Sequence, residues 1–408
     1  MPSQKLPGIA LVWTQFIPTH VDRILATARR LDGKTQLSAI EVASTSQTYG
    51  SFETTGPIAG IERHTLFPGH SYDEISPWRR FWALLFKLVG KKVVCIGIPY
   101  SALETLALTL ILRLLGTSVY LVYDSKFDDK PRSAWFEAIK RLGLGCYSGA
   151  IVAGARTNEY LRFLGFNKRP ILGGADGISV ERIREQARAG QGLAPRQFTE
   201  RDFVYVGRFV EVKNLELLID AYADYESRAK DKARRLILVG EGPLEPALRQ
   251  KVANLGLGEK VQFPGFKSGE VLCALLCCAV ALVLVSGTEP WGLVVNEALA
   301  LGLPIVVSEA PGARDVLVRN LVNGLVVENG SREGLARAMA MMTADEATWQ
   351  EMSAASTARA WLGDSERFAD AAELIVDPAA QPAGAHMAQY LATFEEALGN
   401  QRSRQFSL

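Results

Sequence analysis

The sequence predicts an α/β protein with two doubly wound domains, each built on a parallel sheet and facing the other across a cleft. Short apolar, β-branched runs alternate with helix-length amphipathic stretches along most of the chain. Runs that are apolar throughout are typical of strands covered on both faces, and helical segments between them indicate parallel βαβ units. The length of 408 residues agrees with two or three domains.

The expected strands form two series, one in each half of the chain. They are expected at residues 9–16, 37–43, 92–98, 118–124 and 150–154, and then at residues 203–209, 235–240, 261–266, 279–285, 304–309 and 324–328. A polar stretch at residues 177–200 separates the two series. The expected parts are a domain at residues 1–180, a linker at 181–200, a second domain at 201–380, and a helix within 381–408 that packs back on the first domain.

The charge is balanced overall but differs between the halves. The 45 Lys and Arg residues and the 44 Asp and Glu residues give a net charge of 45 − 44 = +1. Residues 1–200 carry 25 − 17 = +8, and residues 201–408 carry 20 − 27 = −7. The basic first half suits an anionic partner, such as a lipid headgroup or a phosphorylated acceptor. The alternative is a chance excess of charge on solvated faces.

Cysteine usage and the apolar runs predict a cytoplasmic protein. The five cysteines are an odd number without CxxC spacing, which indicates a reducing environment. The apolar run at residues 9–13 is too short for the core of a signal peptide. The fifteen apolar residues at 271–285 are fewer than the roughly 20 that a spanning helix needs. We expect residues 271–285 to be buried core.

Glu289 and Glu297 lie eight residues apart around the start of an expected helix. Pro290 near the helix start and Gly302 after its end are ordinary helix punctuation. The N–H groups of residues 291–294 would then point out of the helix start and form an anion site. One carboxylate would accept hydrogen bonds from sugar hydroxyls, the helix start would hold phosphate, and the other carboxylate would bind a ribose.

Loops after other strands of the second series fit the same ligand. Arg208 ends a strand and Lys213 follows five residues later, and two such cations suit a diphosphate and the charge that develops as it leaves. Pairing of these cations with nearby glutamates on the surface is the structural alternative. Glycine-rich and aromatic turns after the next two strands, at residues 239–245 and 262–267, are weaker signals on their own.

With these motifs in order, the second half resembles the retaining glycosyltransferases of the GT-B fold, in glycosyl transferases group 1, also called family 4. The matching segments are GRFVEVK (207–213), LILVGEGPLE (236–245), VQFPGF (261–266), EPWGLVVNEALALGLPIVVSE (289–309) and NGLVVENG (323–330). The resemblance is strong over residues 200–330, and GGADGISVERI (173–183) is similar to the segment that closes the family's first domain. It implies a GT-B fold with two Rossmann-like domains, the first binding the acceptor and the second a UDP- or GDP-linked sugar.

The resemblance also implies roles for individual residues. Arg208, Lys213 and Glu289 would be catalytic: the two cations would hold the diphosphate, and Glu289 would bind the hydroxyls of the donor sugar. The implied donor-binding residues are Gly207, Gly240, Gly242, Pro243, Phe266, Lys267, Trp291, Gly292, Leu293, Val294 and Glu297. The family implies no cofactor and no metal, in agreement with the lack of a convincing Asp-x-Asp motif. It also implies transfer with retention at the anomeric carbon.

The first half departs from the family pattern. The turn at residues 13–23 contains no glycine, and residues 122–129 stand where many members have a histidine that ends a central strand. The candidate residues on the acceptor side are His20, Arg23, Asp124 and Lys126. Which of them, or of their neighbours, lies at the reacting carbon stays open, and a helix-cap or core-edge position for His20 is equally open.

Residues 76–92 mix aromatic and basic side chains on an expected helix. Such a mixture suits the interfacial zone of an anionic membrane and favours a lipid-linked acceptor. The alternative is a buried helix with solvated ends.

We therefore expect a retaining, metal-independent hexosyltransferase at the inner face of the membrane, which uses a UDP- or GDP-sugar to build a cell-surface polysaccharide or glycolipid. Its partners are the nucleotide sugar and a glycan or lipid-linked acceptor, not a nucleic acid. A transferase of a small soluble acceptor and a non-catalytic sugar-nucleotide-binding subunit are the alternatives. A glycan phosphorylase would need a pyridoxal phosphate lysine, and a dinucleotide dehydrogenase would need a G-x-G-x-x-G turn after the first strand.

Overall fold

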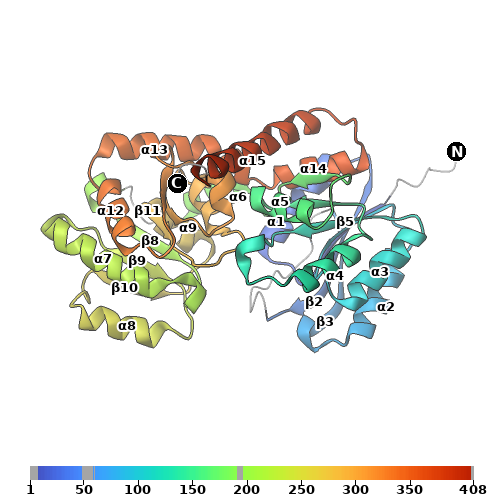
Figure 1. Cartoon of the computed structure of the whole chain (residues 1–408), viewed down its shortest axis with the longest axis horizontal. Coiled ribbons are helices and arrows are strands. Elements are labelled where there is room, and N and C mark those ends of the chain that lie inside the picture. The colour runs from blue at the N-terminus through green and yellow to red at the C-terminus, as the bar shows by residue number, and fades with distance from the viewer. Residues whose placement is uncertain (1–7, 48–57, 59, 191–195, 406–408) are drawn as a thin grey trace. The chain divides into compact units, whose positions relative to one another are not determined.

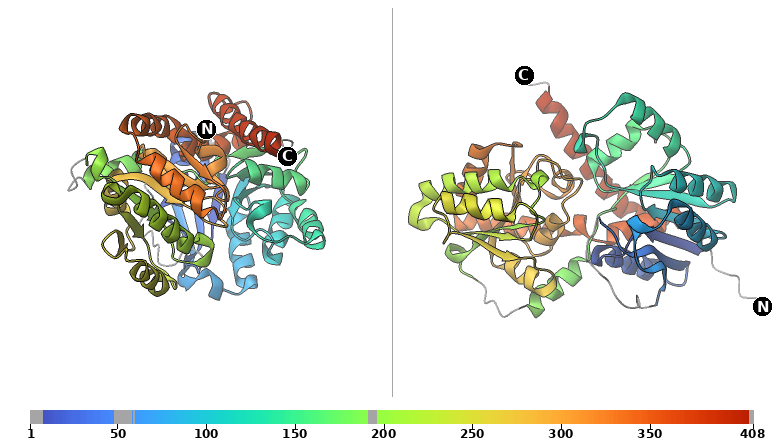
Figure 2. Two further views of the ribbon diagram at one scale, coloured as in Figure 1. Left: turned by 60° about the vertical axis from the view of Figure 1, so that its left-hand side comes forward. Right: turned by 90° about the horizontal axis from the view of Figure 1, so that it is seen from below.

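The computed structural model describes residues 8–47, 58, 60–190 and 196–405 of the chain. These residues form two compact units. The first unit comprises residues 1–127, 131–179 and 364–408, and the second comprises residues 128–130 and 180–363. Each unit has a parallel sheet between helices (Figures 1 and 2). The fold class predicted from the sequence is confirmed at the level of two parallel-sheet Rossmann-like domains.

The first unit contains a seven-stranded sheet in the order β3-β2-β1-β4-β5-β6-β7. Its strands are β1 (Gly8–Trp13), β2 (Gln36–Thr45), β3 (Glu62–Ser71), β4 (Val93–Gly97), β5 (Ser118–Tyr123), β6 (Gly149–Val152) and β7 (Ile171–Gly173). Its helices are α1 (Pro18–Leu31), α2 (Pro77–Leu88), α3 (Leu103–Leu114), α4 (Ala134–Leu144), α5 (Ala155–Phe163), α14 (Glu366–Val376) and α15 (Ala383–Gln405). The central strands β1, β4 and β6 are almost wholly buried, as expected for a sheet covered on both faces.

Two strands of this sheet were not expected from the sequence. Strand β3 is an edge strand that contains Pro68 and Gly69 and leaves much of its length exposed, so it lacks the apolar run by which buried strands are found. Strand β7 has three residues and lies directly after Pro170, too short for a periodic signal.

The second unit contains a six-stranded sheet in the order β10-β9-β8-β11-β12-β13. Its strands are β8 (Asp202–Val206), β9 (Leu236–Val239), β10 (Val261–Gly265), β11 (Ala279–Leu284), β12 (Ile305–Ser308) and β13 (Gly324–Val327). Its helices are α6 (Val180–Ala189), α7 (Leu215–Ala229), α8 (Glu245–Asn254), α9 (Gly269–Cys277), α10 (Val294–Ala300), α11 (Ala313–Leu317), α12 (Arg332–Met342) and α13 (Glu346–Arg359). The apolar run at residues 271–285 forms most of α9 and all of β11, and β11 is buried throughout.

The structure divides the chain differently from the sequence prediction at two places. Residues 181–189 of the expected linker lie in helix α6, which packs on α9 and α10 within the second unit, and residues 191–195 lie outside the described part. Residues 364–380, expected in the second domain, belong to the first unit because helix α14 packs on α1. Hydrophobic periodicity identifies a helix but does not show which sheet the helix covers.

Ion pairs and close packing hold the C-terminal helices in the first unit. Two glutamates of α14 take part: Glu366 pairs with Arg30 of α1 at 2.7 Å, and Glu373 pairs with Lys34, which follows α1, at 2.6 Å. Helix α15 packs on α14, α5 and β7. The Tyr390 hydroxyl of α15 donates to the carbonyl of Ala153 at 3.2 Å, and its ring occupies the space where Gly173 has no side chain. Among the described residues, no helix is both long and apolar enough to cross a bilayer.

Candidate functional site

The strand order of the second unit reverses between the neighbouring strands β8 and β11. From β8 the chain proceeds outward through β9 and β10, and from β11 it proceeds outward on the other side through β12 and β13. In open α/β sheets, ligands bind beyond the carboxyl ends of the strands at such a switch point. The loops that follow β8 and β11 therefore border the expected ligand site, and both contain charged residues singled out from the sequence.

An ion pair joins these two loops. The Lys213 ammonium, after β8, pairs with the Glu289 carboxylate, after β11. The Ser286 hydroxyl donates to the same carboxylate oxygen at 3.1 Å, and the N–H of Gly287 donates to the carbonyl of Val212 at 2.8 Å. The side chains of Lys213 and Glu289 are only 16% and 13% exposed. The structure thus brings together the predicted diphosphate-binding lysine and the predicted sugar-binding glutamate.

Arg208 is exposed and lies in the loop after β8, two residues beyond the end of the strand. Its carbonyl accepts a hydrogen bond from the hydroxyl of buried Tyr205 at 3.1 Å. Burial raises the pKa of Tyr205, the nearby Glu289 carboxylate raises it further, and the Arg208 guanidinium opposes the change. Tyr205 is therefore protonated and lies close to both charged groups. Sequence reasoning did not single it out, because within an apolar strand a tyrosine looks like core.

The glycine turn after β9 packs against the Arg208 loop. A Cβ atom on Gly240 would overlap the carbonyl oxygen of Gly207, and one on Gly242 would lie 2.5 Å from the carbonyl oxygen of Phe209. The N–H of Phe209 donates to the carbonyl of Glu241 at 2.9 Å. The two glycines thus allow the backbones of two loops to touch, and they support the position of Arg208 whatever else the turn contacts.

The start of α10 lies between the two predicted glutamates. The N–H of Val295 donates to the carbonyl of Gly292 at 2.9 Å, so the first turn closes from Gly292, which has a φ of 105°. The side chain of Trp291 is buried and donates to Asn296 at 2.9 Å. Trp291 therefore fixes this loop by packing, while the backbone from Gly292 to Val294 leads into the helix.

Glu297 lies in the first turn of α10 and is partly buried. Burial and then the Glu297 carboxylate raise the pKa of Cys273, in α9, to about 12. Glu297 thus lies near α9, whereas Glu289 pairs with the loop after β8. Phe266 and Lys267 follow β10, and Phe266 is exposed. The structure places the predicted donor residues in the loops after β8, β9, β10 and β11 and in the first turn of α10, at the carboxyl end of one sheet.

Residues 194–359 match the family model for glycosyl transferases group 1. The second unit carries a glycosyl transferases group 1 domain. The sequence prediction of this group is confirmed for the domain that holds the candidate donor residues.

Curated relatives match this chain over part of their length. The D-inositol 3-phosphate glycosyltransferase of Corynebacterium diphtheriae is 28% identical over 240 residues, covering 54% of this chain and 55% of the relative. The lipopolysaccharide core biosynthesis glycosyltransferase LpsE of Rhizobium meliloti is 33% identical over 140 residues, covering 34% of this chain and 38% of the relative. The alpha-D-kanosaminyltransferase of Streptomyces kanamyceticus is 29% identical over 148 residues, covering 36% of each. The chain thus spans between about a third and about half of these relatives.

Solved structures match the whole fold at low identity. Anabaena HepE in complex with UDP and glucose has a TM-score of 0.64 and 16% identity, covering 90% of this chain and 99% of that one. The sucrose-phosphate synthase of Thermosynechococcus elongatus has a TM-score of 0.65 and 20% identity, covering 89% of this chain and 96% of that one. These likenesses show the GT-B fold. The expectation that the domains face a cleft stays a prediction.

The acceptor-side candidates belong to the first unit, outside the group 1 domain. Buried His20 stacks on Trp13 at 4.8 Å, and its Nδ1 lies 2.9 Å from the carbonyl oxygen of Gln15. Burial, and then the Arg23 guanidinium, holds the pKa of His20 well below 6.5, so the ring is neutral at pH 7. This position agrees with the core-edge alternative for His20.

The other three candidates differ in exposure. Arg23 is buried and donates to the carbonyl of Gly177 at 3.0 Å and to Asp176 at 3.3 Å, so it holds the segment that leads out of the first unit. Lys126 is buried, and Asp124 is exposed. Of the four predicted residues, only Asp124 presents an exposed side chain in this structure.

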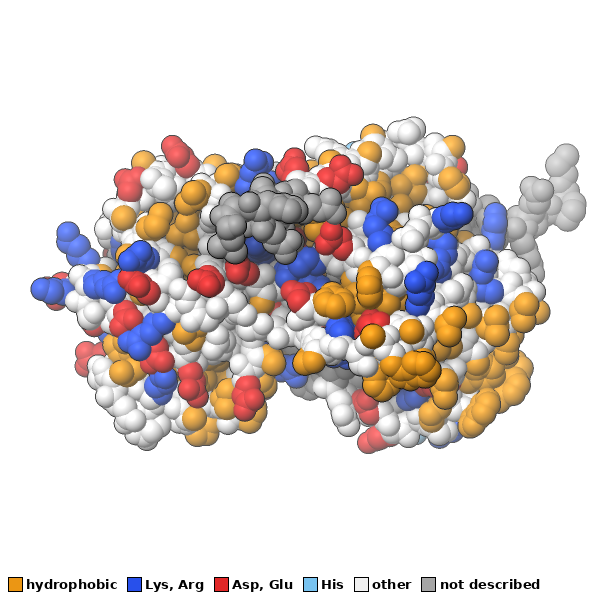
Figure 3. Space-filling view, in the orientation of Figure 1, with side chains coloured by type: hydrophobic (Ala, Val, Ile, Leu, Met, Phe, Trp, Pro, Cys, Tyr) orange, Lys and Arg blue, Asp and Glu red, His pale blue; other side chains and the backbone are white. Residues whose placement is uncertain are grey.

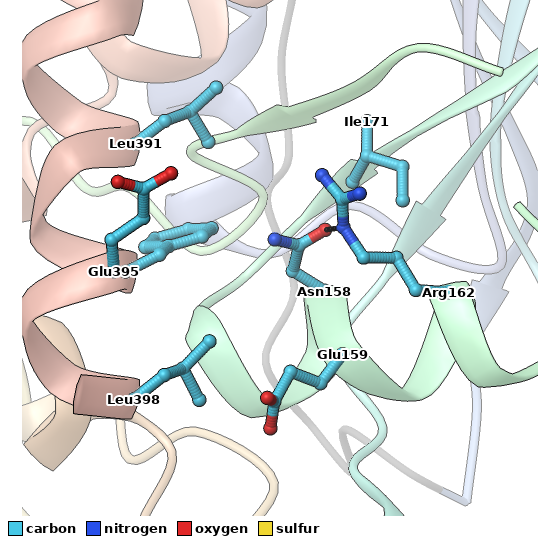
Figure 4. Close-up of a pocket in the computed structure, with 8 residues that line it drawn as sticks. Asn158, Glu159, Arg162, Ile171, Leu391, Glu395 and Leu398 are labelled. Carbon is cyan, nitrogen blue, oxygen red and sulfur yellow. Dashed lines mark hydrogen bonds between the residues drawn. The ribbon is translucent and has the colours of Figure 1, made fainter. Parts of the chain in front are cut away.

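A pocket of about 350 Å³ lies in the first unit between α5, β7 and α15 (Figure 4). It is lined by Asn158, Glu159, Arg162, Ile171, Leu391, Phe394, Glu395 and Leu398. None of the predicted site residues lines it, and Arg162 donates to Asn158 at 3.3 Å inside it. Within the described ranges, no group of three or more His, Cys, Asp or Glu side chains could hold a metal ion.

Proposed function

We propose that the protein is a retaining glycosyltransferase that moves a hexosyl unit from a UDP- or GDP-linked sugar to a hydroxyl acceptor. The observation that carries the proposal is the grouping of Arg208, Lys213 and Glu289 at the switch point of the sheet within the group 1 domain. Cations at this point suit a diphosphate, and a carboxylate beside them suits the hydroxyls of the attached sugar.

In the proposed reaction, the bond between the anomeric carbon and the diphosphate oxygen breaks while the acceptor oxygen forms a bond to the same face of that carbon. The acceptor proton passes to the departing diphosphate, so the step needs no protein nucleophile. Arg208 and Lys213 would stabilise the charge that develops on the diphosphate. Glu289 would orient the sugar and Glu297 would bind the ribose, so that the protein acts by positioning and electrostatics.

The acceptor in this proposal is a glycan or a lipid-linked precursor of a cell-surface polysaccharide or glycolipid, and the reaction takes place at the cytoplasmic face of the membrane. The basic first half supports this choice, because it suits an anionic acceptor or surface. We propose that no cofactor or metal takes part. Activity that persists in a chelator would support this part of the proposal, and activity restored only by added divalent cation would contradict it.

The test is a panel of UDP-, GDP-, ADP- and dTDP-sugars, assayed by thermal shift and by released nucleotide. We expect one donor to stabilise the protein and to be hydrolysed slowly, and Glu289→Ala to abolish the hydrolysis. Glu333→Ala is the matched control, because Glu333 lies in the same unit on the exposed side of α12 and pairs with Arg337. Hydrolysis that survives Glu289→Ala would remove Glu289 from the site. If no donor binds, a non-catalytic role takes its place.

A further inference from the structure

We propose that the outward sides of helices α2, α3 and α4 in the first unit form one surface that docks on a membrane containing anionic lipids. This inference names the surface for the membrane contact in the proposed function, and it does not depend on the donor site. We call this surface the α2–α4 face. Hydrophobic side chains gather over these three helices in Figure 3, with Lys and Arg side chains among them.

Each helix contributes a stripe of large apolar side chains that point to solvent. The stripes consist of Trp78, Trp82 and Phe86 in α2, Leu103, Leu110 and Leu114 in α3, and Trp135, Ile139 and Leu142 in α4. Within each stripe the residues are three, four or seven positions apart, so they share one side of their helix. Each of these nine side chains belongs to a residue that is between 48% and 83% exposed.

The three stripes belong to one continuous surface. Helix α2 packs on α3. Helix α3 touches α4, because a Cβ atom on Gly143 of α4 would lie 3.0 Å from the Leu106 side chain of α3. Each helix also buries its other side, as α2 does with Phe81, Leu84 and Leu88. The exposed stripes are therefore an addition to the core-facing sides and are not needed to attach the helices to the sheet. A continuous surface with this many exposed apolar side chains indicates a site of interaction with another molecule or with a membrane.

The positive charge of the α2–α4 face indicates an anionic partner. Residues 76–92, 103–116 and 133–145, which contain the three helices and their ends, carry eight Lys and Arg and two Glu, or 8 − 2 = +6. Both acids are paired within the surface: Glu104 lies 2.5 Å from Arg80, and Glu137 lies 2.8 Å from Lys140. Aromatic and leucine side chains beside a cation excess suit the headgroup zone of an anionic bilayer. A second copy of this face would bring like charges together.

The test uses the full-length protein and two kinds of vesicle, one of phosphatidylcholine alone and one in which part of it is replaced by phosphatidylglycerol. We expect the protein to sediment with the phosphatidylglycerol vesicles, and salt to weaken the binding. The variant Trp78→Ser/Trp82→Ser/Phe86→Ser should bind at least about tenfold more weakly, since it removes one apolar stripe. The variant Lys87→Gln/Lys92→Gln/Arg113→Gln/Arg141→Gln should bind the phosphatidylglycerol vesicles more weakly, with affinity falling by about fivefold for each cation removed.

The control variant Leu255→Ser/Val322→Ser/Met341→Ser removes three exposed apolar side chains from the second unit and should bind like wild type. Thermal unfolding checks that each variant folds. If the α2 variant does not fold, Trp135→Ser/Ile139→Ser/Leu142→Ser repeats the test on α4.

Two results would overturn the proposal. One is equal binding, or no binding, to both kinds of vesicle by the wild-type protein. The other is a wild-type dimer in solution that the α2 variant converts to monomer, which would make the face an interface between copies. Vesicle binding of the expected pattern without any sugar-nucleotide turnover would leave this proposal standing and would count against the proposed function alone.

Discussion

Lys213 and Glu289 join two loops of the group 1 domain by an ion pair that is mostly shielded from water. Ser286 donates to the same carboxylate, so Glu289 is held by two partners at one oxygen. A diphosphate bound beside Arg208 would compete with Glu289 for the Lys213 ammonium and would free the carboxylate for sugar hydroxyls. Pairing of Lys213 in the structure is thus compatible with its proposed role in donor binding.

At the residue scale, we expect Arg208→Ala and Lys213→Ala each to lower turnover by about 10²–10³, as the loss of one group that stabilises developing charge does. The measurement is the rate of donor turnover under saturating sugar nucleotide. Arg337→Ala is the control, because Arg337 is an exposed cation of the same unit that pairs with Glu333. Turnover within about threefold of wild type for both site variants would refute their assignment.

A second prediction at this scale concerns His20. Its pKa in the folded protein is well below 6.5, so below pH 6.5 the unfolded chain binds a proton that the folded chain does not. The His20 contribution to stability is therefore complete above pH 6.5 and is lost as the pH falls toward the folded pKa, with a slope of at most about 1.4 kcal/mol per pH unit. Urea unfolding between about pH 7 and about pH 5.5 measures it. His20→Phe should remove this part of the slope, and an unchanged slope would show that other groups cause it.

At the scale of elements, the loops after β8 and β9 form one assembly that depends on two glycines. Gly240→Ala places a methyl group against the carbonyl oxygen of Gly207, which is backbone and cannot turn aside. We expect a loss of about 1–3 kcal/mol in the free energy of unfolding, together with weaker donor binding because the Arg208 loop must shift. Chemical denaturation and donor titration measure the two effects.

Gly258→Ala is the matched control in the same unit, since no atom lies within 4 Å of the added methyl group. Its stability and donor affinity should equal those of wild type. Equal behaviour of the two alanine variants would contradict the close approach of the two loops.

At the scale of the whole molecule, apart from the short segment 128–130, the chain leaves the first unit after residue 179 and returns to it at residue 364. We expect residues 180–363 to fold alone, because their sheet and all of its helices lie within this segment. Residues 1–179 should not fold stably alone, because they would lose the ion pairs of α14 with Arg30 and Lys34 and the packing of Tyr390 on Gly173.

Circular dichroism and thermal unfolding of the separate segments test this division. Co-expression of residues 364–408 with residues 1–179 should restore a cooperative transition. A stable, cooperative fold of residues 1–179 alone would show that the C-terminal helices are dispensable.

The sequence determined most of the group 1 domain. Its inner strands β8, β9, β11 and β12 are almost wholly buried, so each appears as an apolar run. The loops that follow β8, β9 and β11 carry Arg208, Lys213, Gly240 and Glu289 at positions that any parallel sheet brings to its carboxyl end. The local sequence pattern and the topology were together sufficient to predict these site residues, because each residue lies within a few positions of the strand that places it.

Only the tertiary structure decided features that depend on contacts between distant segments. The pairing of Lys213 with Glu289, the burial of His20 and Arg23, and the return of α14 to the first unit each join residues far apart in the sequence or depend on packing around them. The α2–α4 face is the same kind of feature. A helical stripe of apolar residues has the same period whether it points to a core or to solvent, and only packing on the sheet shows which side is left exposed.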